Sequence, residues 1–590
     1  MSLTAVPAYF LARRVLRPAY ALGAAALAVA IPSMVYTGTI MSETVFYPVF
    51  VAVALALVLA LERPTPARQL VVVGACLVAF LARSQAVVLV PAVATAPAVL
   101  GWLDGSVRRA VAAFRLLYGL LAAAVVVVLV VQLARGHSPY DVLGSYNVTG
   151  HAHYSADQVL RWLLFHVAEL DLYLGVVPFA VLLLLAAIGR SLDRPLRILL
   201  AAAVPLSTWL VLEVATFASA WSSRVQERNM AYVAPLFLIA LLSWIERGMP
   251  RPARPTTAAA LVAAALPGAL PYGTLISESA KSDTLALMPL WWLQETILSP
   301  ATIPVIVVLV ALALAAAFVF LTPRWALALP LAVAAWFVFA TERVEDFDHG
   351  FHRSSMGALF QGITTGMPNW IDRRVGRDAD VAFLFSGKDP TQQPLTLWEN
   401  EFFNRSVGTV YDLRQPAMGE LPEHRVTERA DGVLVADGRP VRHRYVLTDT
   451  SVPLAGTVVA QDAPKGMVLY RTDGLVRIGY RVQGLYRDDT WSGRHVVYTR
   501  LRCNGGRVTA FLMGDATLFG DRSQTVRAEG RSVTFRQDST ARLTVPLRAR
   551  GGVCRVVFTV EHTAIPAAVL PRNGDGRVLG AHFLSFRFHR

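Results

Sequence analysis

The chain has 590 residues, of which 55% are hydrophobic, and its mean hydropathy is +0.47. This composition excludes an ordinary soluble domain and indicates a membrane protein. The net charge of +14 at pH 7 could indicate a nucleic-acid partner. However, the excess of basic over acidic residues is seven in residues 1–341 and seven again in residues 342–590. The tail therefore has no concentrated basic face, and we reject a nucleic-acid partner.

Long apolar runs recur as far as residue 341, and about 20 apolar residues suffice to cross a bilayer. We therefore predict a polytopic α-helical membrane domain of about 12 spans over residues 1–341, followed by a tail without spans. The predicted spans are 3–16, 19–36, 45–61, 69–82, 84–103, 111–134, 171–189, 197–218, 230–247, 256–272, 300–321 and 324–341.

Arginines are concentrated in alternate loops between these spans, and the positive-inside rule assigns such loops to the cytoplasm. The other set of loops holds more acidic than basic residues. This topology predicts that Glu43, Arg83, the loop 135–170, the N-terminus and the whole tail lie outside the cytoplasm. The arginines of the predicted cytoplasmic loops are Arg13, Arg14, Arg17, Arg63, Arg68, Arg108, Arg109, Arg190, Arg194, Arg197, Arg247, Arg251, Arg254 and Arg324.

Glu43 lies in a short turn between two apolar runs. A carboxylate at the mouth of paired spans is costly unless it faces water or a partner, so Glu43 is a candidate catalytic residue. The alternative is a solvated loop carboxylate. Arg83 also lies between two apolar runs on the same side. Its guanidinium can hold a phosphate through a planar fork of donors, or it can extend to the interface beside lipid headgroups.

Other polar residues on this side are weaker candidates. Arg224 and Arg228 can bind a second anionic group or form ion pairs within their own loop. Glu213 lies inside an apolar span and must face a cavity or a partner such as one of these arginines. The loop histidines match no closed zinc pattern, so the metal requirement stays open. Candidate substrate contacts are Tyr36, Tyr140, Asp141, His151 and His153.

Several motifs of soluble-nucleotide and hydrolase chemistry are absent from the sequence, including a Walker phosphate loop, a dinucleotide fingerprint, a Gly-x-Ser-x-Gly elbow and a zinc helix. Energy from a soluble nucleotide is therefore not expected. An enzyme acting outside the cytoplasm needs a donor that is already activated, and a lipid-linked phosphate meets that need.

Four short segments occur in a recognisable order: Leu11-Ala12-Arg13-Arg14, Tyr36-Thr37-Gly38 with Glu43 seven residues after the tyrosine, Glu62-Arg63-Pro64, and Leu81-Ala82-Arg83-Ser84 before an apolar run with Pro91. This order resembles the GT-C class of membrane glycosyltransferases, of the polyprenyl-phosphate-sugar-dependent protein-mannosyltransferase and aminoarabinose-transferase type. The resemblance covers about residues 1–250. High usage of Ala, Val, Leu and Arg suggests an actinobacterial version.

The resemblance implies inverting transfer of a sugar from a polyprenyl phosphate to an acceptor at the outer face of a bacterial plasma membrane. Members use an acid in the first external loop as base, and a second acid after the third span lies in the same site. Glu43 is similar to the second acid, Arg83 to the residue that holds the lipid phosphate, and Arg224 and Arg228 to a later phosphate- or acceptor-binding loop. The chain begins within what would be the family's second span, so the principal acid has no counterpart among its residues.

The tail is predicted to contain two parts. Residues 342–478 mix buried strands, such as 380–385, with a helix or turn near 397–406, which indicates an α/β domain. Residues 479–590 contain short alternating strands separated by Gly, Asp and Asn turns, which is typical of a β-sandwich. This second part resembles the carbohydrate-binding sandwiches of actinobacterial cell-wall glycosyltransferases.

Two pairs of residues in the sandwich are candidates for specific roles. Tyr486 and Trp491 are candidate glycan contacts, with ordinary turn and core roles as the alternative. Cys503 and Cys554 form a disulfide if the tail is extracytoplasmic, and stay two buried thiols otherwise.

The leading hypothesis is a glycosyltransferase that transfers a sugar from a polyprenyl phosphate to a cell-envelope glycan or protein. The hypothesis requires no particular cofactor, although a divalent cation bridging the phosphate would suit this chemistry. The competing hypothesis is a catalytically incomplete membrane protein that binds glycan, or a transporter of lipid-linked sugar.

Overall fold

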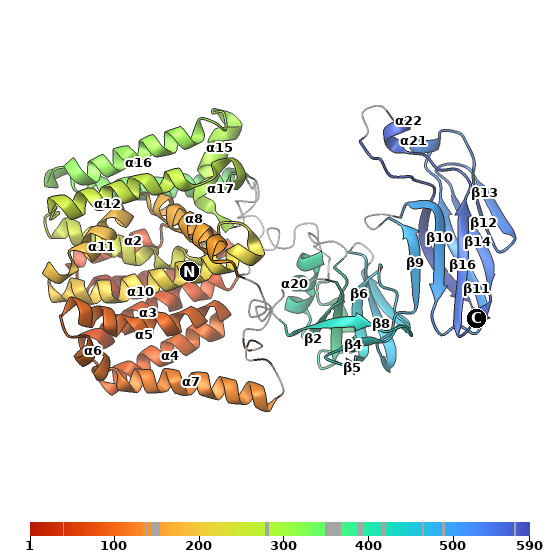
Figure 1. Ribbon diagram of the computed structural model, residues 1–590, viewed down its shortest axis with the longest axis horizontal. Helices are drawn as coiled ribbons and strands as arrows, with labels where there is room; N and C mark the ends of the chain where they lie inside the picture. Colours follow the sequence, from red (N-terminus) through yellow and green to blue (C-terminus); the bar gives the residue numbers. More distant parts are fainter. Residues whose placement is uncertain are drawn as a thin grey trace. The chain divides into compact units, whose positions relative to one another are not determined.

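The computed structural model describes residues 1–38, 41–135, 138, 140, 142, 154–277, 283–347, 367–387, 393–414, 421–462, 465–486, 490–570 and 574–589. The chain divides into two compact units, Met1–Gln361 and Gly362–Arg590, and each is described by itself (Figure 1). The predicted end of the membrane domain at residue 341 falls inside a helix that continues to Phe347.

The first unit is built from helices, and many of them begin with proline in their first turn, where its missing N–H costs no hydrogen bond. The helices are α1 (Ala5–Ala12), α2 (Pro18–Ala28), α3 (Glu43–Glu62), α4 (Pro66–Ala82), α5 (Leu89–Leu103), α6 (Val107–Ala113), α7 (Arg115–Ala134), α8 (Ala156–Leu174), α9 (Val177–Ala187), α10 (Arg194–Phe217), α11 (Ala234–Glu246), α12 (Ala253–Ala265), α13 (Tyr272–Leu275), α15 (Met288–Thr296), α16 (Ile303–Phe320) and α17 (Ala328–Phe347).

Within the described residues, six helical segments are long and apolar enough to cross a membrane, or seven if α8 and α9 form one bent span. Four further apolar helices are shorter. The predicted count of about 12 spans is therefore not confirmed. The six segments are Glu43–Glu62, Ser84–Leu103, Arg115–Ala134, Arg194–Ser222, Ile303–Phe320 and Pro323–Arg343.

The prediction of a loop over 135–170 followed by a span over 171–189 is wrong. Helix α8 already begins at Ala156, and the chain then bends by 113° before α9. The bend is possible because Gly175 caps α8 in the left-handed conformation, with φ of 78°. Asp157 and Arg161 interrupt the apolar residues of α8, so this helix is amphipathic and has no continuous apolar run to detect.

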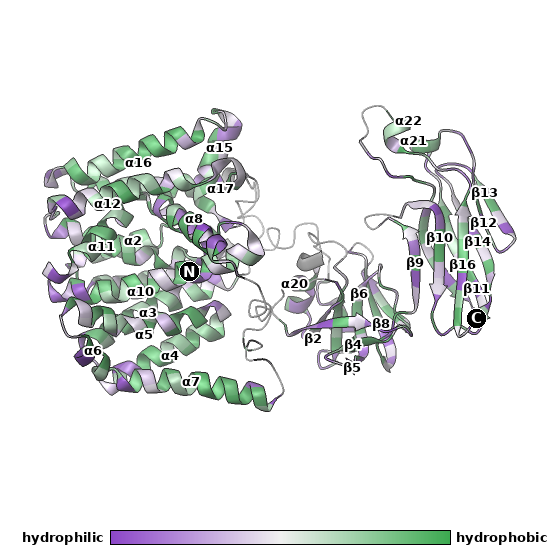
Figure 2. Cartoon of the chain, in the orientation of Figure 1, coloured by the Kyte–Doolittle hydropathy of each residue, from purple (hydrophilic) through white to green (hydrophobic). Residues whose placement is uncertain are grey.

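The helical unit has the surface expected of a membrane protein. Figure 2 shows hydrophobic residues along the helices and hydrophilic residues gathered mainly at their ends. Only 6% of the apolar window of α7 is buried within the protein, so nearly all of its aliphatic surface faces outward. Such a surface is stable in hydrocarbon and costly in water.

The second unit begins with a mixed sheet of eight strands, in the order β5-β4-β3-β2-β1-β6-β8-β7. Strand β1 pairs in parallel with β2 and β6, which agrees with the predicted α/β domain. The elements are α19 (Trp370–Val375), β1 (Val381–Phe385), α20 (Gln393–Phe403), β2 (Val407–Asp412), β3 (Glu423–Glu428), β4 (Leu434–Ala436), β5 (Arg439–Pro440), β6 (Arg442–Asp449), β7 (Thr457–Asp462) and β8 (Met467–Leu475).

Two antiparallel sheets follow and share one apolar core, which includes Val508 from one sheet and Val556 and Phe558 from the other. This arrangement agrees with the predicted β-sandwich. The sheets have the orders β13-β12-β16-β10-β9, with β15 beside β16, and β14-β11-β17. The strands are β9 (Tyr480–Leu485), β10 (Ser492–Arg500), β11 (Gly506–Met513), β12 (Gln524–Ala528), β13 (Arg531–Phe535), β14 (Thr540–Leu547), β15 (Ala549–Arg550), β16 (Val553–Val560) and β17 (His582–His589).

A disulfide joins Cys503 to Cys554 and closes a loop with a sequence separation of 51 residues. Chain entropy alone predicts that a loop of this size stabilises a fold by about 4 kcal/mol. We expect Cys503→Ser with Cys554→Ser to increase hydrogen exchange of the amides in β11 and β16 under non-denaturing conditions. Exchange in α3 and α10 of the same variant is the internal control and should not change. Equal protection of the sandwich in both proteins would show that the bond contributes little.

Candidate functional site

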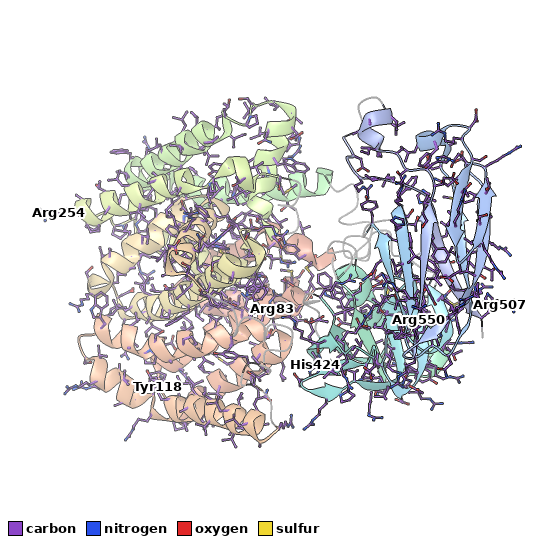
Figure 3. The ribbon with its side chains drawn as sticks, turned by 45° about the vertical axis from the view of Figure 1, so that its right-hand side comes forward. Arg83, Tyr118, Arg254, His424, Arg507 and Arg550 are labelled. Atoms are coloured by element: carbon purple, nitrogen blue, oxygen red, sulfur yellow. A yellow bond between two sulfur atoms is a disulfide. The ribbon has the colours of Figure 1, made fainter. Side chains whose placement is uncertain are left out.

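The charged residues of the helical unit gather in two groups. Figure 3 shows Arg254 and Arg83 at opposite ends of this unit. The four acids assigned to the cytoplasmic loops are each paired with an arginine of the same set. The pairs of the first group include Arg14–Glu62 at 2.6 Å, Arg17–Glu246 at 2.8 Å, Arg197–Asp104 at 3.1 Å and Arg247–Asp193 at 2.8 Å.

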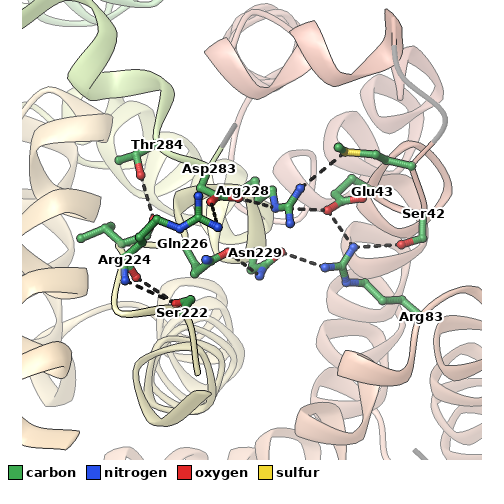
Figure 4. A network of polar contacts seen from close by, with 12 residues as sticks. Ser42, Glu43, Arg83, Ser222, Arg224, Gln226, Arg228, Asn229, Asp283 and Thr284 are labelled. Atoms are coloured by element: carbon green, nitrogen blue, oxygen red, sulfur yellow. Dashed lines mark hydrogen bonds and ion pairs between the residues drawn. The ribbon is translucent and has the colours of Figure 1, made fainter. Parts of the chain in front are cut away.

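Glu43 and Arg83 form the first part of the candidate site (Figure 4). Glu43 is the first residue of α3 and is 3% exposed, and its carboxylate lies 2.8 Å from the Arg83 guanidinium. Arg83 follows the last residue of α4. Its guanidinium also donates to the Ser42 hydroxyl at 2.9 Å and to the Asn229 side-chain carbonyl at 2.8 Å. The guanidinium group of Arg83 thus joins the start of α3 to the segment before α11.

Arg228 extends the network to a second acid. Its Nε lies 3.9 Å from the Glu43 carboxylate and 3.1 Å from that of Asp283, which is 2% exposed. Arg224 lies 2.9 Å from the other Asp283 oxygen. The four residues predicted at this site, Glu43, Arg83, Arg224 and Arg228, therefore belong to one network of ion pairs (Figure 4).

The network has three guanidinium groups and two carboxylates, so its formal charge is +1. An excess positive charge and several N–H donors favour an anion such as a phosphate. Both carboxylates of the network are paired with arginines in this structure. Within the described part of the chain, no group of three or more His, Cys, Asp or Glu residues is arranged to hold a metal ion.

A cavity of about 460 Å³ adjoins the network between α5 and α10. One end is polar: Arg83 and Asn229 line it, and Gln85 donates to the Glu213 carboxylate at 3.0 Å. Glu213 thus faces a cavity, as its position in a span required, and its partner here is Gln85. The remaining wall is mainly apolar and is formed by Val87, Val88, Pro91, Trp209, Leu212, Val214 and Phe217.

Buried hydrogen bonds hold the segment that carries Arg228. The backbone N–H of Gln226 donates to Nε2 of His166, whose Nδ1 lies 2.7 Å from the Trp162 carbonyl oxygen. Nδ1 therefore carries the proton, and the imidazole is neutral. The fully buried Glu227 accepts from the backbone N–H of Ala286 at 2.7 Å, which ties this segment to the one that contains Asp283.

Burial raises the pKa of Glu227 to about 7, and its carboxyl lies beside that of Glu169. The folded protein therefore binds a proton that the unfolded chain releases near pH 4.5, so this contribution to stability is complete at low pH and is lost as the pH rises through about 7. We expect the unfolding temperature to fall between pH 5 and pH 8, and to fall less in Glu227→Gln. Glu246→Gln, which changes an acid of the opposite end, is the control and should keep the wild-type slope.

The remaining predicted substrate contacts have different positions. Tyr36 is 1% exposed and lies within electrostatic range of Glu227 and of the network residues Arg228 and Asp283. Tyr140 is 46% exposed, and its predicted substrate contact stays a prediction. Asp141, His151 and His153 lie outside the described residues.

The candidate glycan contacts of the sandwich already have intramolecular partners. The Tyr486 hydroxyl donates to the carbonyl of Val578, and the Arg577 guanidinium lies 5.0 Å from its ring centre. The rings of Trp491 and His582 have centroids 3.9 Å apart. These contacts agree with structural roles, and the glycan contact stays a prediction.

Asp283 and Asn229 were not identified from the sequence. Asn229 directly follows Arg228, so its proximity to the arginines was a usable signal. Asp283 has no such signal, because it is far along the chain from the residues that it contacts. Searches against models of protein families and against curated proteins found no match to this chain.

Proposed function

We propose that this protein is a membrane glycosyltransferase of GT-C type that transfers a sugar from a polyprenyl phosphate to a cell-envelope acceptor. The observation that supports this most directly is the network of three arginines and two carboxylates beside the cavity between α5 and α10. One end of that cavity offers guanidinium donors for a phosphate, and the rest offers an apolar wall for an isoprenoid chain.

In the proposed reaction, an acceptor hydroxyl oxygen forms a bond to the anomeric carbon of the sugar. The bond from that carbon to the phosphate oxygen breaks, and its electron pair leaves with the lipid phosphate. Arg83 stabilises the charge on this leaving group. When the phosphate takes over donors of Arg83, the Glu43 carboxylate is released from part of its ion pair and accepts the proton of the acceptor hydroxyl.

The proposal includes a location. The site and the second unit lie outside the cytoplasm of a bacterial plasma membrane, where the donor lipid and the acceptor are present. Two observations support this. Arg254, from one of the arginine-rich loops, lies at the end of the helical unit opposite to Arg83, and the second unit has a disulfide, which persists in oxidising compartments.

The alternative is a catalytically incomplete protein that binds or transports a lipid-linked sugar. The observation in its favour is that both carboxylates of the network, Glu43 and Asp283, are paired with arginines and neither stands ready as a base. In this alternative the same arginines hold the lipid phosphate, and no bond to the sugar is broken.

One assay separates the two functions. The purified protein in nanodiscs is incubated with a polyprenyl phosphate that carries a radiolabelled sugar and with cell-envelope extract. Transferase activity predicts that the label moves from the donor lipid to a new product. Binding of the donor without formation of any product would favour the alternative.

A further inference from the structure

A second cavity, of about 310 Å³, lies in the helical unit between the bend that joins α8 to α9 and the helices α15, α16 and α17. Its lining consists of aliphatic residues, glycine and Trp336. The indole N–H of Trp336 donates to the Tyr173 carbonyl at 3.1 Å, so this polar group is already satisfied. The cavity is separate from the one between α5 and α10, with which it shares no lining residue.

The position of this cavity indicates what can fill it. Helices α16 and α17 are candidate spans, and only 28% of the apolar window of each is buried within the protein. Their surroundings in a membrane are hydrocarbon. Water gains no hydrogen bonds from an apolar lining, whereas a hydrocarbon chain gains dispersion contacts. The volume equals that of about ten water molecules at about 30 Å³ each, which suits a segment of a lipid chain.

A series of aromatic rings leads from the cavity to an arginine. Trp336 lies beside Phe339, with ring centroids 6.4 Å apart, and Phe339 lies 6.2 Å from Trp292. The Arg343 guanidinium lies 4.7 Å from the Trp292 ring centre. Tryptophan and arginine are the residues that proteins place at the headgroup level of a bilayer. A lipid in this cavity would therefore present an anionic headgroup near Arg343.

The cavity is connected to the candidate site through one short segment. Asp283 at the start of this segment holds Arg224 and Arg228, whereas Leu290 and Leu293 farther along it line the second cavity. The first cavity reaches the same network through Arg83 and Asn229. The first cavity thus adjoins the ion-pair network directly. The second cavity is linked to the network by the chain segment 283–293, which contributes residues to both.

We propose that the second cavity binds the hydrocarbon chain of the acceptor, and that the acceptor is a lipid-linked molecule with an anionic headgroup. This inference rests on the proposed transferase function. The donor chain occupies the cavity between α5 and α10, the acceptor chain occupies the cavity beside α16 and α17, and the sugar is transferred at the network.

The first test follows the transferred label. Membranes containing the full chain are incubated with the radiolabelled donor, and unreacted donor is removed by mild acid, which cleaves sugar phosphates. Label that remains in the chloroform–methanol extract, in a product larger than the donor sugar, supports a lipid-linked acceptor. Label found only in protein or in delipidated glycan would overturn the inference and leave the transferase proposal intact, whereas the absence of any product would count against the transferase itself.

The second test uses two neighbouring residues of α16. Val310 lines the cavity and Leu309 does not, although their exposed fractions are similar, at 52% and 60%. Val310→Trp is expected to raise the KM for the extracted acceptor by about tenfold, with the KM for the donor unchanged, and Leu309→Trp should match wild type. Photolabelling in nanodiscs with a phosphatidylglycerol that carries a diazirine in its acyl chain provides a readout independent of activity.

Val310→Trp should reduce photolabelling of the buried cavity-lining residues Leu329 and Val333, and Leu309→Trp should not. Unchanged labelling in Val310→Trp would show that no lipid chain enters the cavity and would overturn the inference. Reduced labelling with unchanged acceptor KM would also overturn it, because the cavity would then hold a membrane phospholipid that takes no part in transfer.

Discussion

Arg83→Ala is expected to lower kcat/KM for sugar transfer by about 100- to 1,000-fold, the usual effect of removing one donor that stabilises a developing negative charge. The side chain contacts Glu43, Ser42 and Asn229, so alanine also removes these links between α3, α4 and the segment before α11. Steady-state kinetics with the radiolabelled donor measure the effect. Arg83→Lys keeps the charge but loses the planar fork, and should have intermediate activity.

Arg68→Ala is the matched control for this prediction. Arg68 lies in the first turn of α4 and Arg83 follows its last residue, so the two arginines flank opposite ends of the same helix. Arg68→Ala should retain the wild-type rate. Equal losses in both variants would point to damage of α4 as a whole, and wild-type activity of Arg83→Ala would show that the phosphate is bound elsewhere.

The central part of the candidate site could be predicted because membrane topology limits where charges can lie. Glu43, Arg83, Arg224 and Arg228 were assigned to one side by the distribution of arginines among loops. Because the connections between apolar segments are short, these side chains are confined to the same end of the helical unit. The structure joins all four in one network.

Other parts could not be predicted, because they depend on contacts between distant segments. Asp283 pairs with Arg224 and Arg228, which lie between α10 and α11, only after distant segments have come together, and no local pattern marks it. The count of about 12 spans is not confirmed, because some apolar runs do not form one long helix. The run that follows Pro18 divides into α2 and a separate 3-10 helix beginning at Pro32, where the proline lacks the N–H that a continuing helix needs.

Glu43→Gln is expected to lower kcat by about 100-fold or more, because the amide keeps the shape of the side chain but cannot accept a proton. The KM for the donor separates two roles of this residue. A residue that acts only by holding Arg83 in place would mainly raise the KM for the donor, whereas a base lowers kcat with little change in that KM. We expect the second result in kinetics with the radiolabelled donor.

Glu62→Gln is the matched control, because Glu43 and Glu62 are the first and last residues of α3 and each is paired with an arginine of another segment. Both substitutions remove one negative charge from an ion pair, so a general effect of charge loss on stability should appear in both. A loss of activity only in Glu43→Gln therefore identifies the chemistry of its position. If Glu43→Gln and Arg83→Ala both match wild type, this network is not the catalytic site, and its ion pairs serve to hold α3, α4 and the segment before α11 together.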